Sequence, residues 1–446
     1  FRKESDNKHD IAIALNNIGD IYHSIGKYNE ALKYREESLK IYKELNIPKC
    51  ILSSYLNIGA TYLLLKDYKK AEGLYRTTEK EYMKIDSTTR IGTPLIVDVY
   101  IATGKFNDAL KALRDEMPPN LQDATPYKIQ YYTQKGIALK GTGNIKNASE
   151  EFLKAVTLSE EMRQRVKGEK SGFFGAGSSG GRIRAYIGLI STLAERAMSG
   201  ERIDNEFVSY GKDLASAAFY FAESTKARTL LEQMAQSAKK SQRVDIPEDL
   251  RQKEESLINR LSAIENQWED AYKKGEDALK ELIKRKEEFK KELDSLIAKL
   301  RKEYPRYAAL NYPKPIPAEE LPLKEDEVLL EYAIGDDAGY LFVVRKGGVK
   351  KLIKIPVSKE DIEAKIKGFM EPMNTKQHER FSAKEAKALY DILLAEAIKD
   401  IKDKGKIIIV PDGILGLLPF EALVMKEGSS IKNSLYVGDR YIISYY

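Results

Sequence analysis

The segment Lys406-Ile-Ile-Ile-Val-Pro-Asp-Gly-Ile-Leu-Gly-Leu-Leu-Pro-Phe-Glu-Ala-Leu423 decides the fold of the C-terminal part of the chain. Its branched apolar run, Ile407 to Val410, predicts a buried strand. The tripeptide Pro411-Asp412-Gly413 then predicts a tight turn, because proline presets its own backbone angle and glycine tolerates positive φ. Pro419 redirects the chain. The large apolar side chains of the second run are expected in the core: Leu418, Phe420 and Leu423.

Strand and helix signals precede this segment from residue 305 onward. Two glycine-containing turn signals, Gly335-Asp-Asp-Ala-Gly339 and Gly347-Gly348, separate runs with the composition of strands. Mixed strands and helices predict an α/β domain with a layered sheet over residues 305–446. The predicted elements are the strands Glu327 to Ile334, Tyr340 to Val344 and Val349 to Ile355, and the helices Lys359 to Met370 and Ala383 to Lys402.

Residues 248–302 are highly charged and carry narrow apolar seams, as paired helices do. A break at Lys273-Lys-Gly-Glu-Asp277 separates two helical stretches, Glu248 to Lys274 and Glu276 to Lys302. An antiparallel helical hairpin joined at Gly275 is the simplest arrangement, and it defines a connector over residues 241–304. We prefer a plain spacer over a lever between two domains. The seam residues are Leu257, Leu261, Ile264, Trp268, Leu279, Ile283, Phe289, Leu293, Leu296 and Leu300.

An internal repeat organises the first half of the chain. One set of residues, Ile18-Gly19, Tyr22, Gly26, Tyr28 and Ala31, returns 40 residues later as Ile58-Gly59, Tyr62, Lys66, Tyr68 and Ala71. A third copy keeps Tyr100, Gly104, Phe106 and Ala109, and a fourth has Gly136, Leu139, Gly143, Ile145, Ala148, Phe152 and Ala155. At least three usable copies are enough for stacked units to share a continuous core.

Each copy has the pattern of a helix pair. Gly19 and Gly59 lack a side chain where two helices must approach closely, and a bulky residue and an alanine fill the remaining gap. Three glycines end a helix in a left-handed turn: Gly26, Gly104 and Gly143. The pattern resembles the tetratricopeptide repeat in a longer-period form, over roughly residues 10–162. The resemblance implies an α-solenoid, which we expect over residues 1–240, closed by an amphipathic helix from Ala217 to Ala235.

The inner helices of such a solenoid line a groove that binds peptides or partner domains. Asn17 and Asn57 occupy the same slot on successive inner helices, and Gln134 occupies it in the fourth repeat. Asparagine is a poor residue for a helix interior, so an amide that recurs at one slot suggests hydrogen bonding to an extended peptide backbone. Solvated polar residues on an exposed helix face explain the pattern equally well.

The glycine-rich segment Gly168-Glu-Lys-Ser-Gly-Phe-Phe-Gly-Ala-Gly-Ser-Ser-Gly-Gly181 looks at first like a phosphate-binding loop. A P-loop follows a strand and places Gly-Lys-Ser/Thr at the start of a helix. This segment follows a helical stretch and lacks that motif. We therefore expect a turn between repeat helices, and neither a nucleotide nor another cofactor.

The composition sets broad limits. The chain has 446 residues, 42% of them hydrophobic, and a formal net charge of +6 from 74 Lys and Arg and 68 Asp and Glu. The two signs are interleaved, so nucleic acid is not an expected partner. No apolar run of about 18 residues exists to span a membrane, and no metal site is predicted. The single cysteine, Cys50, suits a reducing compartment, so we expect a cytoplasmic protein, and because the chain begins with Phe1 we expect a missing N-terminus.

Further motifs follow the repeats in order: Glu223 with Lys226-Ala-Arg228, Leu329-Leu-Glu-Tyr332, Leu389-Tyr-Asp-Ile-Leu393, Ile409-Val-Pro-Asp-Gly413 and Leu418-Pro-Phe-Glu-Ala-Leu423. Together with the repeats they resemble the TPR-CHAT family, whose CHAT domain is a caspase-like, separase-related cysteine protease fold. The resemblance implies that residues 305–446 are the N-terminal, incomplete part of such a domain. Its most specific part runs from Pro411 to Phe420. For Asp412 and Glu421 we prefer turn and capping roles over catalysis.

The family's catalytic pair is a histidine, typically followed by glycine at one strand end, and a cysteine in a Ser-Ala-Cys type motif at the next. In such a dyad the imidazole favours the thiolate, and backbone amides hold the oxyanion. Neither motif occurs in this chain. The histidines His9, His23 and His378 follow no apolar strand, and Cys50 precedes a repeat helix, where we expect a packed side chain. No residue is assigned as catalytic.

Two functions are consistent with these patterns. The preferred hypothesis is the partner-sensing, non-catalytic portion of a caspase-like cysteine protease. When complete, that protein would cleave a protein substrate after a protein or peptide ligand engages the repeat groove. The alternative is a protein-interaction scaffold whose protease-like domain is degenerate. Because the strand-like run Tyr441 to Tyr446 would normally pair inside a sheet, we also expect truncation there and poor solubility of that edge.

Overall fold

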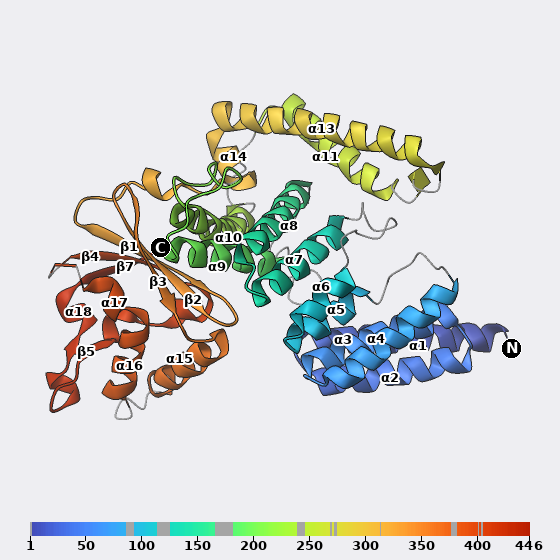
Figure 1. The fold of residues 1–446 in the computed structure, drawn as a ribbon, viewed down its shortest axis with the longest axis horizontal. Helices are drawn as coiled ribbons and strands as arrows, with labels where there is room; N and C mark the ends of the chain where they lie inside the picture. The colour runs from blue at the N-terminus through green and yellow to red at the C-terminus, as the bar shows by residue number, and fades with distance from the viewer. Residues whose placement is uncertain are drawn as a thin grey trace. The chain divides into compact units, whose positions relative to one another are not determined.

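The computed structural model describes residues 2–85, 93–113, 125–165, 182–238, 246–267, 270–271, 274–312, 314–375, 381–399, 401–402 and 405–446 (Figure 1). The chain divides into two compact units. The repeat unit comprises Phe1–Leu158 and Glu265–Leu282. The sheet unit comprises Ser159–Ile264 and Ile283–Tyr446.

Helix pairs build the repeat unit, as the 40-residue pattern predicts. Its helices are α1 (Arg2–Ser24), α2 (Tyr28–Glu44), α3 (Pro48–Leu64), α4 (Tyr68–Ile85), α5 (Thr93–Ala102), α6 (Phe106–Leu113), α7 (Thr125–Gly141) and the first part of α8 (Ile145–Arg165). The predicted left-handed turns are confirmed, with φ of +77° at Gly26, +70° at Gly104 and +83° at Gly143. Lys66 takes this position in the second repeat, with φ of +62°.

Small residues let the paired helices approach closely. A Cβ added at Gly59 would lie 2.4 Å from Cε1 of Tyr75, and one at Gly136 would lie 2.8 Å from Cδ1 of Phe152. The recurring alanines are fully buried: Ala31, Ala71, Ala109 and Ala148. The packing roles that the sequence predicts for the repeat glycines and alanines are therefore confirmed.

The charged region forms α11 (Glu248–Asn266), which ends before the predicted Lys274, and α13 (Glu276–Glu303), which matches the second predicted helix. Gly275 precedes α13 with φ of +104°. In the sheet unit, Leu257 and Leu296 belong to one core that also includes α14 (Pro305–Asn311). Ile283, predicted in the seam, is 41% exposed, whereas Leu282 is buried. One residue turns a helix by about 100°, so the seam shifts to the neighbouring position there. Trp268 lies outside the described residues.

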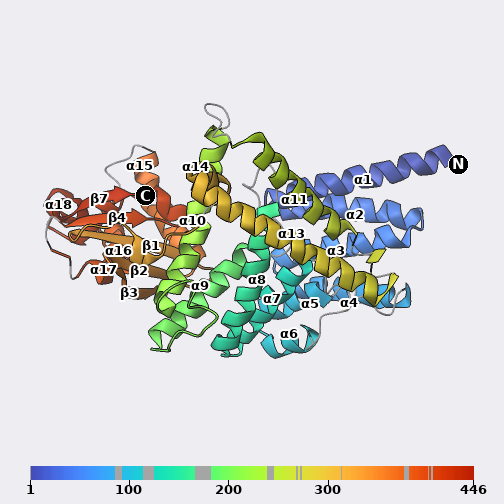
Figure 2. The same ribbon diagram turned by 90° about the horizontal axis from the view of Figure 1, so that it is seen from above.

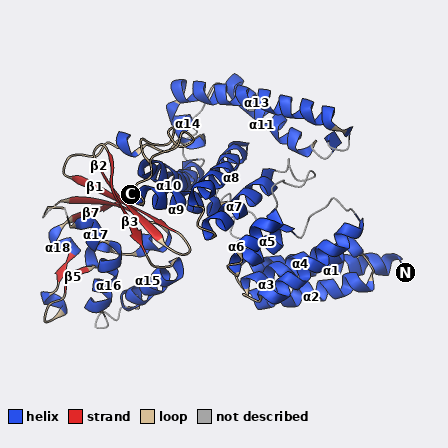
Figure 3. Ribbon diagram, in the orientation of Figure 1, coloured by secondary structure: helices blue, strands red, loops and turns tan. Residues whose placement is uncertain are grey.

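A five-stranded sheet forms the centre of the sheet unit (Figure 3). Its strands are β1 (Glu327–Ile334), β2 (Gly339–Arg345), β3 (Gly348–Ile355), β4 (Lys406–Val410) and β7 (Ile442–Tyr445), in the order β3-β2-β1-β4-β7. β2 pairs antiparallel with β1 and β3, and β4 pairs parallel with β1 and β7. The predicted strands are thus confirmed. A second, two-stranded sheet consists of β5 (Val424–Lys426) and β6 (Leu435–Tyr436).

Helices cover both faces of the five-stranded sheet (Figure 1). One face carries a core shared with α15 (Lys359–Asn374), α16 (Ala383–Leu393), α17 (Ala395–Ile398) and α18 (Val437–Arg440). The other face carries α9 (Ile183–Met198) and α10 (Leu214–Ala238), where the rings of Phe219 and Phe342 lie 5.9 Å apart. The helix predicted from Ala383 to Lys402 is interrupted at Leu394, between α16 and α17. The helix predicted from Ala217 to Ala235 lies within α10, which packs on α9 and on the sheet.

Short 3-10 turns complete the sheet unit. They are η2 (Ala318–Glu320), η4 (Gly413–Leu417), η5 (Phe420–Ala422) and η6 (Ile431–Asn433). Two of them, η4 and η5, come after the Pro411-Asp412 step that follows β4 and lead the chain into the core. Leu415, Leu418, Phe420 and Leu423 are all buried there, as the sequence predicts for the last three.

Candidate partner-binding surface

Helix α2 packs against both α1 and α3 (Figure 2). Hydrogen-bonded polar side chains connect α1 to α3. Nδ2 of Asn57 donates a hydrogen bond to Oδ1 of Asn16 at 3.3 Å, and Nδ2 of Asn16 donates to Oδ2 of Asp20 at 3.3 Å. Asn17, next to Asn16, is exposed, and so is Asp20. We call these four residues the amide surface. It offers amide donors and acceptors next to one carboxylate.

Arg35 of α2 supports the amide surface from inside the repeat unit. Its side chain is buried, with Nη2 2.6 Å from Oδ1 of Asp20. Nη1 donates to the main-chain oxygen of Asn57 at 2.7 Å and also reaches Oγ1 of Thr61 and Nδ1 of His23. One buried guanidinium thus connects α1, α2 and α3.

Arg35 takes a place that large apolar or aromatic residues take in the other repeats. The position four residues after the buried alanine holds Arg35 in α2, Tyr75 in α4, Leu113 in α6 and Phe152 in α8. A glycine of the first helix faces it, since a Cβ at Gly19 would lie 2.8 Å from Cγ of Arg35. Sequence reasoning missed this residue. The available signal was a charged side chain in a slot that otherwise holds apolar or aromatic residues, because a buried guanidinium requires polar partners.

His23 is neutral in this cluster at neutral pH. Burial is the main cause that lowers its pKa below the usual 6.5, and the Arg35 guanidinium lowers it further, while Asp20 opposes the shift. Its Nδ1 lies 3.2 Å from Nη1 of Arg35, which places this nitrogen as an acceptor. The ring also meets Tyr28 edge-on, with centroids 5.6 Å apart. The carboxylate of Asp20 is therefore balanced by Arg35 and not by His23.

The three residues predicted to bind a partner differ in exposure. Asn17 is exposed on α1, Asn57 is half-buried on α3, and Gln134 is only 2% exposed on α7. Asn57 belongs to the row of polar side chains, and Asn16, which the repeat comparison did not single out, joins it. A ligand that lies across α1 and α3 therefore meets the asparagines and not Gln134.

Family models identify the helix pairs. Residues 10–80 match one model described as a tetratricopeptide repeat, and residues 129–162 match a second model with the same description. These segments are tetratricopeptide repeats. No curated protein matches the chain. A solved structure described as "MamA RS-1 ArsTM double mutant" is 18% identical and covers 51% of this chain and 97% of that chain, with a TM-score of 0.30.

Outside the tetratricopeptide repeats, the Pro-Asp-Gly motif fixes the carboxyl ends of two strands. Oδ2 of Asp412 accepts a hydrogen bond from the backbone N–H of Ile334 at 2.6 Å, so it caps β1. Gly413 adopts φ of +53°, and Pro411 and Pro419 flank the turn with partly exposed rings.

Phe420 anchors the segment that follows this turn. Its side chain is fully buried, and its ring lies 5.6 Å from that of Tyr332 and 6.3 Å from that of Tyr445. The backbone N–H of Phe420 donates to the hydroxyl of Tyr445 at 2.9 Å, and that hydroxyl donates to Glu421. These contacts hold β7 against the segment after β4.

A buried ionic cluster joins α10 to β1. Nζ of Lys226 lies 3.5 Å from Oε1 of Glu331, which is completely buried, and it also donates to the main-chain oxygen of Tyr332. Burial raises the pKa of Glu331 well above its ordinary value; Lys226 opposes this shift and Glu223 adds to it. Burial therefore favours the protonated form of this carboxyl group, even beside Lys226.

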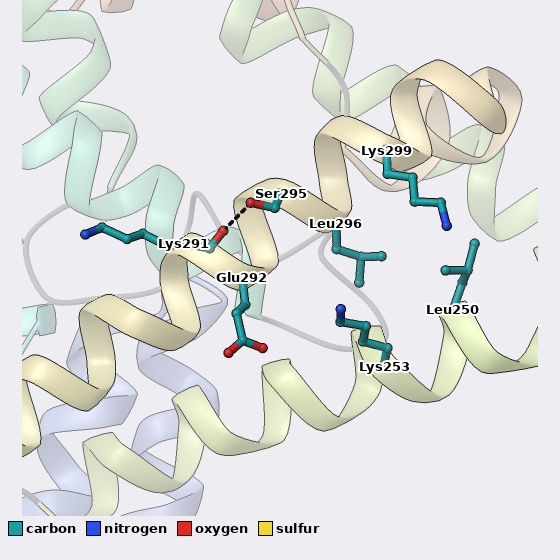
Figure 4. A pocket seen from close by; sticks show the side chains of 7 residues that line it. All are labelled: Leu250, Lys253, Lys291, Glu292, Ser295, Leu296 and Lys299. Atoms are coloured by element: carbon teal, nitrogen blue, oxygen red, sulfur yellow. Dashed lines mark hydrogen bonds between the residues drawn. The ribbon is translucent and has the colours of Figure 1, made fainter.

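A shallow hollow of about 390 Å³ lies between α11 and α13 (Figure 4). Leu250 and Leu296 contribute apolar surface, and the charged lining residues are all exposed: Lys253, Lys291, Glu292 and Lys299. Lys291 points away from α11, and the hydroxyl of Ser295 donates to the main-chain oxygen of Lys291 at 2.8 Å. The hollow thus presents exposed charges, whereas the amide surface is held in place by the buried Arg35.

The thiol and the described histidines lie in the repeat unit. His9 and His23 belong to α1, and Cys50 is partly buried near the start of α3. His378 and residues 168–181 lie outside the described part of the chain. Within the residues that the structure describes, no group of three His, Cys, Asp or Glu side chains could hold a metal ion. Over the same residues, no helix is long and apolar enough to cross a membrane.

Proposed function

We propose that the tetratricopeptide repeats bind an extended segment of a partner protein across α1 and α3. A peptide backbone offers N–H and C=O groups in alternation, and a carboxamide side chain can both donate and accept. Asn16, Asn17 and Asn57 therefore match its hydrogen-bonding pattern. The observation that carries the proposal is the exposed amide of Asn17 beside the hydrogen bond between Asn16 and Asn57.

Arg35 supports this proposal because it fixes the surface before a ligand arrives. Its bonds to Asp20 and to the main chain of Asn57 hold α1 and α3 in one arrangement. A preorganised surface loses less conformational entropy on binding. Gln134 shares the slot of Asn17 and Asn57, but its buried side chain would have to move before it could contact a partner.

A peptide selected by display against the whole chain tests the proposal. Its affinity is measured by calorimetry for the parent and for the double variant Asn17→Ala, Asn57→Ala. We expect a Kd at least tenfold higher for the variant, since two hydrogen bonds of about 1 kcal/mol each are lost. Glu37→Ala, an exposed change on α2, is the matched control and should bind as the parent does. Equal affinity of the double variant and the parent would contradict the proposal.

We further propose that the sheet unit includes the first part of a CHAT-type, caspase-like domain, and that the chain is the partner-sensing, non-catalytic portion of a cysteine protease. The parallel strands β1, β4 and β7, with helices on both faces, support this proposal. So does the Pro-Asp-Gly motif after β4, where Asp412 caps β1. No residue of this chain is assigned to catalysis, and cleavage of a protein substrate would require the complete enzyme.

The coding sequence after Tyr446 separates this proposal from its alternative, a scaffold with a degenerate protease-like domain. A strand-ended His-Gly and a later Ser-Ala-Cys motif would support the protease. Strands without either motif would support the scaffold. In an extended protein with both motifs, replacing the cysteine by alanine should abolish cleavage of the substrate while the repeats still bind the selected peptide.

We also propose a cytoplasmic location. A single cysteine, Cys50, fits a reducing compartment. Fractionation of cells that express the tagged full-length protein tests this location, and recovery outside the cytoplasm would contradict it.

A further inference from the structure

Three polar side chains meet beside the amide surface at slots that later repeats fill with apolar residues: His23, Arg35 and Thr61. The slot of His23 holds Leu63 in α3, and the slot of Thr61 holds Val99 in α5. Burying a polar group costs free energy unless it is hydrogen-bonded. Three polar exceptions that contact one another therefore indicate that they act together.

The imidazole of His23 is an acceptor in this cluster. Its Nδ1 lies 3.2 Å from Nη1 of Arg35 and 3.4 Å from Oγ1 of Thr61. A guanidinium only donates, so Nδ1 must carry a lone pair, as it does in the neutral ring with its proton on Nε2. A proton on Nδ1 would remove this acceptor and place a second positive charge beside the guanidinium. The contact between His23 and Arg35 is therefore compatible only with the neutral ring.

One carboxylate faces the two cations that protonation would create. The charged groups that act on the His23 ring are Arg35 of α2 and Asp20 of α1, and Oδ1 of Asp20 already lies 2.6 Å from Nη2 of Arg35. Helix α2 also contributes the uncharged ring of Tyr28, and α3 contributes a hydroxyl and a main-chain oxygen. A protonated ring would therefore draw Asp20 away from Arg35 or displace the guanidinium.

A displaced guanidinium would change the amide surface directly. Nη1 of Arg35 donates to the main-chain oxygen of Asn57 at 2.7 Å, and Nη2 holds Asp20, which accepts from the amide of Asn16. These bonds fix α1 and α3 in one arrangement. A peptide that lies across both helices binds best to a surface that is already arranged.

We propose that peptide binding at the amide surface is coupled to the protonation state of His23. The neutral ring maintains the binding arrangement, and uptake of a proton by the ring releases the peptide. Coupling between two sites is reciprocal, so the bound peptide in turn lowers the proton affinity of the ring. This inference rests on the proposed peptide binding across α1 and α3, and it adds a proton as an effector of that same surface.

The pH dependence of peptide affinity tests the coupling. Burial and then the Arg35 guanidinium lower the pKa of His23 below 6.5, so the effect is expected in mild acid. A display-selected peptide without Asp, Glu or His is titrated by calorimetry at pH 7.5 and at pH 5.0. We expect the Kd of the parent to rise about threefold or more at pH 5.0, and that of His23→Gln to rise by less than about twofold. The matched control His9→Gln, on the same helix, should follow the parent, because His9 contacts the ring of Tyr42.

Proton release by the parent provides a second measurement that needs no variant. Binding enthalpies at pH 5.5 in two buffers with different ionisation enthalpies give the number of protons exchanged. We expect protons to be released when the peptide binds. Proton uptake, or no exchange, would overturn the coupling.

The outcomes distinguish the coupling from the binding itself. Suppose that a peptide binds the parent at pH 7.5 more tightly than it binds the double variant Asn17→Ala, Asn57→Ala. Equal pH dependence in the parent and in His23→Gln then overturns the coupling alone, and so does a pH dependence that His9→Gln removes. Equal affinity of the parent and the double variant at pH 7.5 overturns both proposals.

Discussion

Nη2 of Arg35 lies 2.6 Å from Oδ1 of Asp20, and the same guanidinium donates to the main-chain oxygen of Asn57. The first contact ties α2 to α1, and the second ties α2 to α3. The arrangement of the amide surface therefore depends on Arg35, whose own side chain is buried.

Replacing Arg35 by alanine should destabilise the first two repeats. The change leaves a cavity beside Gly19 and removes the donor to the Asn57 carbonyl, so we expect a loss of about 2 kcal/mol in the free energy of opening α1 to α3. Native-state hydrogen exchange of those helices measures this loss. Lys33→Ala, an exposed change on the same helix, should stay within about 0.5 kcal/mol of the parent. A loss in Arg35→Ala no larger than in this control would refute the role of Arg35.

His23 should make the same helices less stable in mild acid. Its pKa is lowered in the folded state, chiefly by burial, so the unfolded chain takes up the proton first as the pH falls below about 6.5. Stability contributed by the neutral ring is complete above that pH and is lost below it. We expect His23→Gln to show a smaller loss than the parent between pH 7.5 and 5.5, by hydrogen exchange corrected for intrinsic rates. Parallel curves for the two proteins would rule out this contribution.

Gly59 and Gly73 are two helical glycines that differ in the space available for an added side chain. An alanine at Gly59 would place its Cβ 2.4 Å from Cε1 of Tyr75, whereas one at Gly73 meets nothing within 4 Å. We expect Gly59→Ala to cost about 1–3 kcal/mol through overpacking, and Gly73→Ala to stabilise α4 by about 0.5–1 kcal/mol. Urea denaturation followed by circular dichroism gives both values. Equal effects of the two substitutions would contradict the close helix approach at Gly59.

Glu331 should lower the stability of the sheet unit at neutral pH. Its folded-state pKa is raised, mainly by burial, so its contribution to stability is complete below the ordinary pKa near 4.5 and declines as the pH rises. Glutamine keeps the shape without a charge. We therefore expect Glu331→Gln to gain about 1–2 kcal/mol over the parent at pH 7.5 and less at pH 4.5.

Urea denaturation at the two pH values tests this expectation, with Glu325→Gln as an exposed control in the same unit. A less stable Glu331→Gln at pH 7.5 would mean that Glu331 is ionised and pairs with Lys226.

The sequence predicts the type and bounds of helices and strands well where one hydrophobic period dominates a segment. The strand Glu327–Ile334 has the bounds that its apolar run indicates, and the turn glycines of the repeats have the expected positive φ. Boundaries set by tertiary packing were harder to predict. Leu394 interrupts the helix expected from Ala383 to Lys402, and the seam of α13 uses Leu282 instead of Ile283.

The candidate site was only partly visible in the sequence. Asn17 and Asn57 recur at one slot, which a repeat comparison detects, but the equivalent Gln134 is buried. Exposure depends on which neighbouring helix covers a slot, and periodicity does not carry that information. Arg35 was missed for a related reason, because its partners come from α1 and α3 and lie 12 to 26 residues away along the chain.

Photo-crosslinking tests whether a bound peptide lies on the amide surface. The photoreactive residue p-benzoylphenylalanine replaces Asn17 in one protein and Glu37 in another, and each is irradiated with the display-selected peptide. We expect covalent capture of the peptide at position 17 and none at position 37, because the ligand lies across α1 and α3. Capture at position 37 and none at position 17 would contradict it.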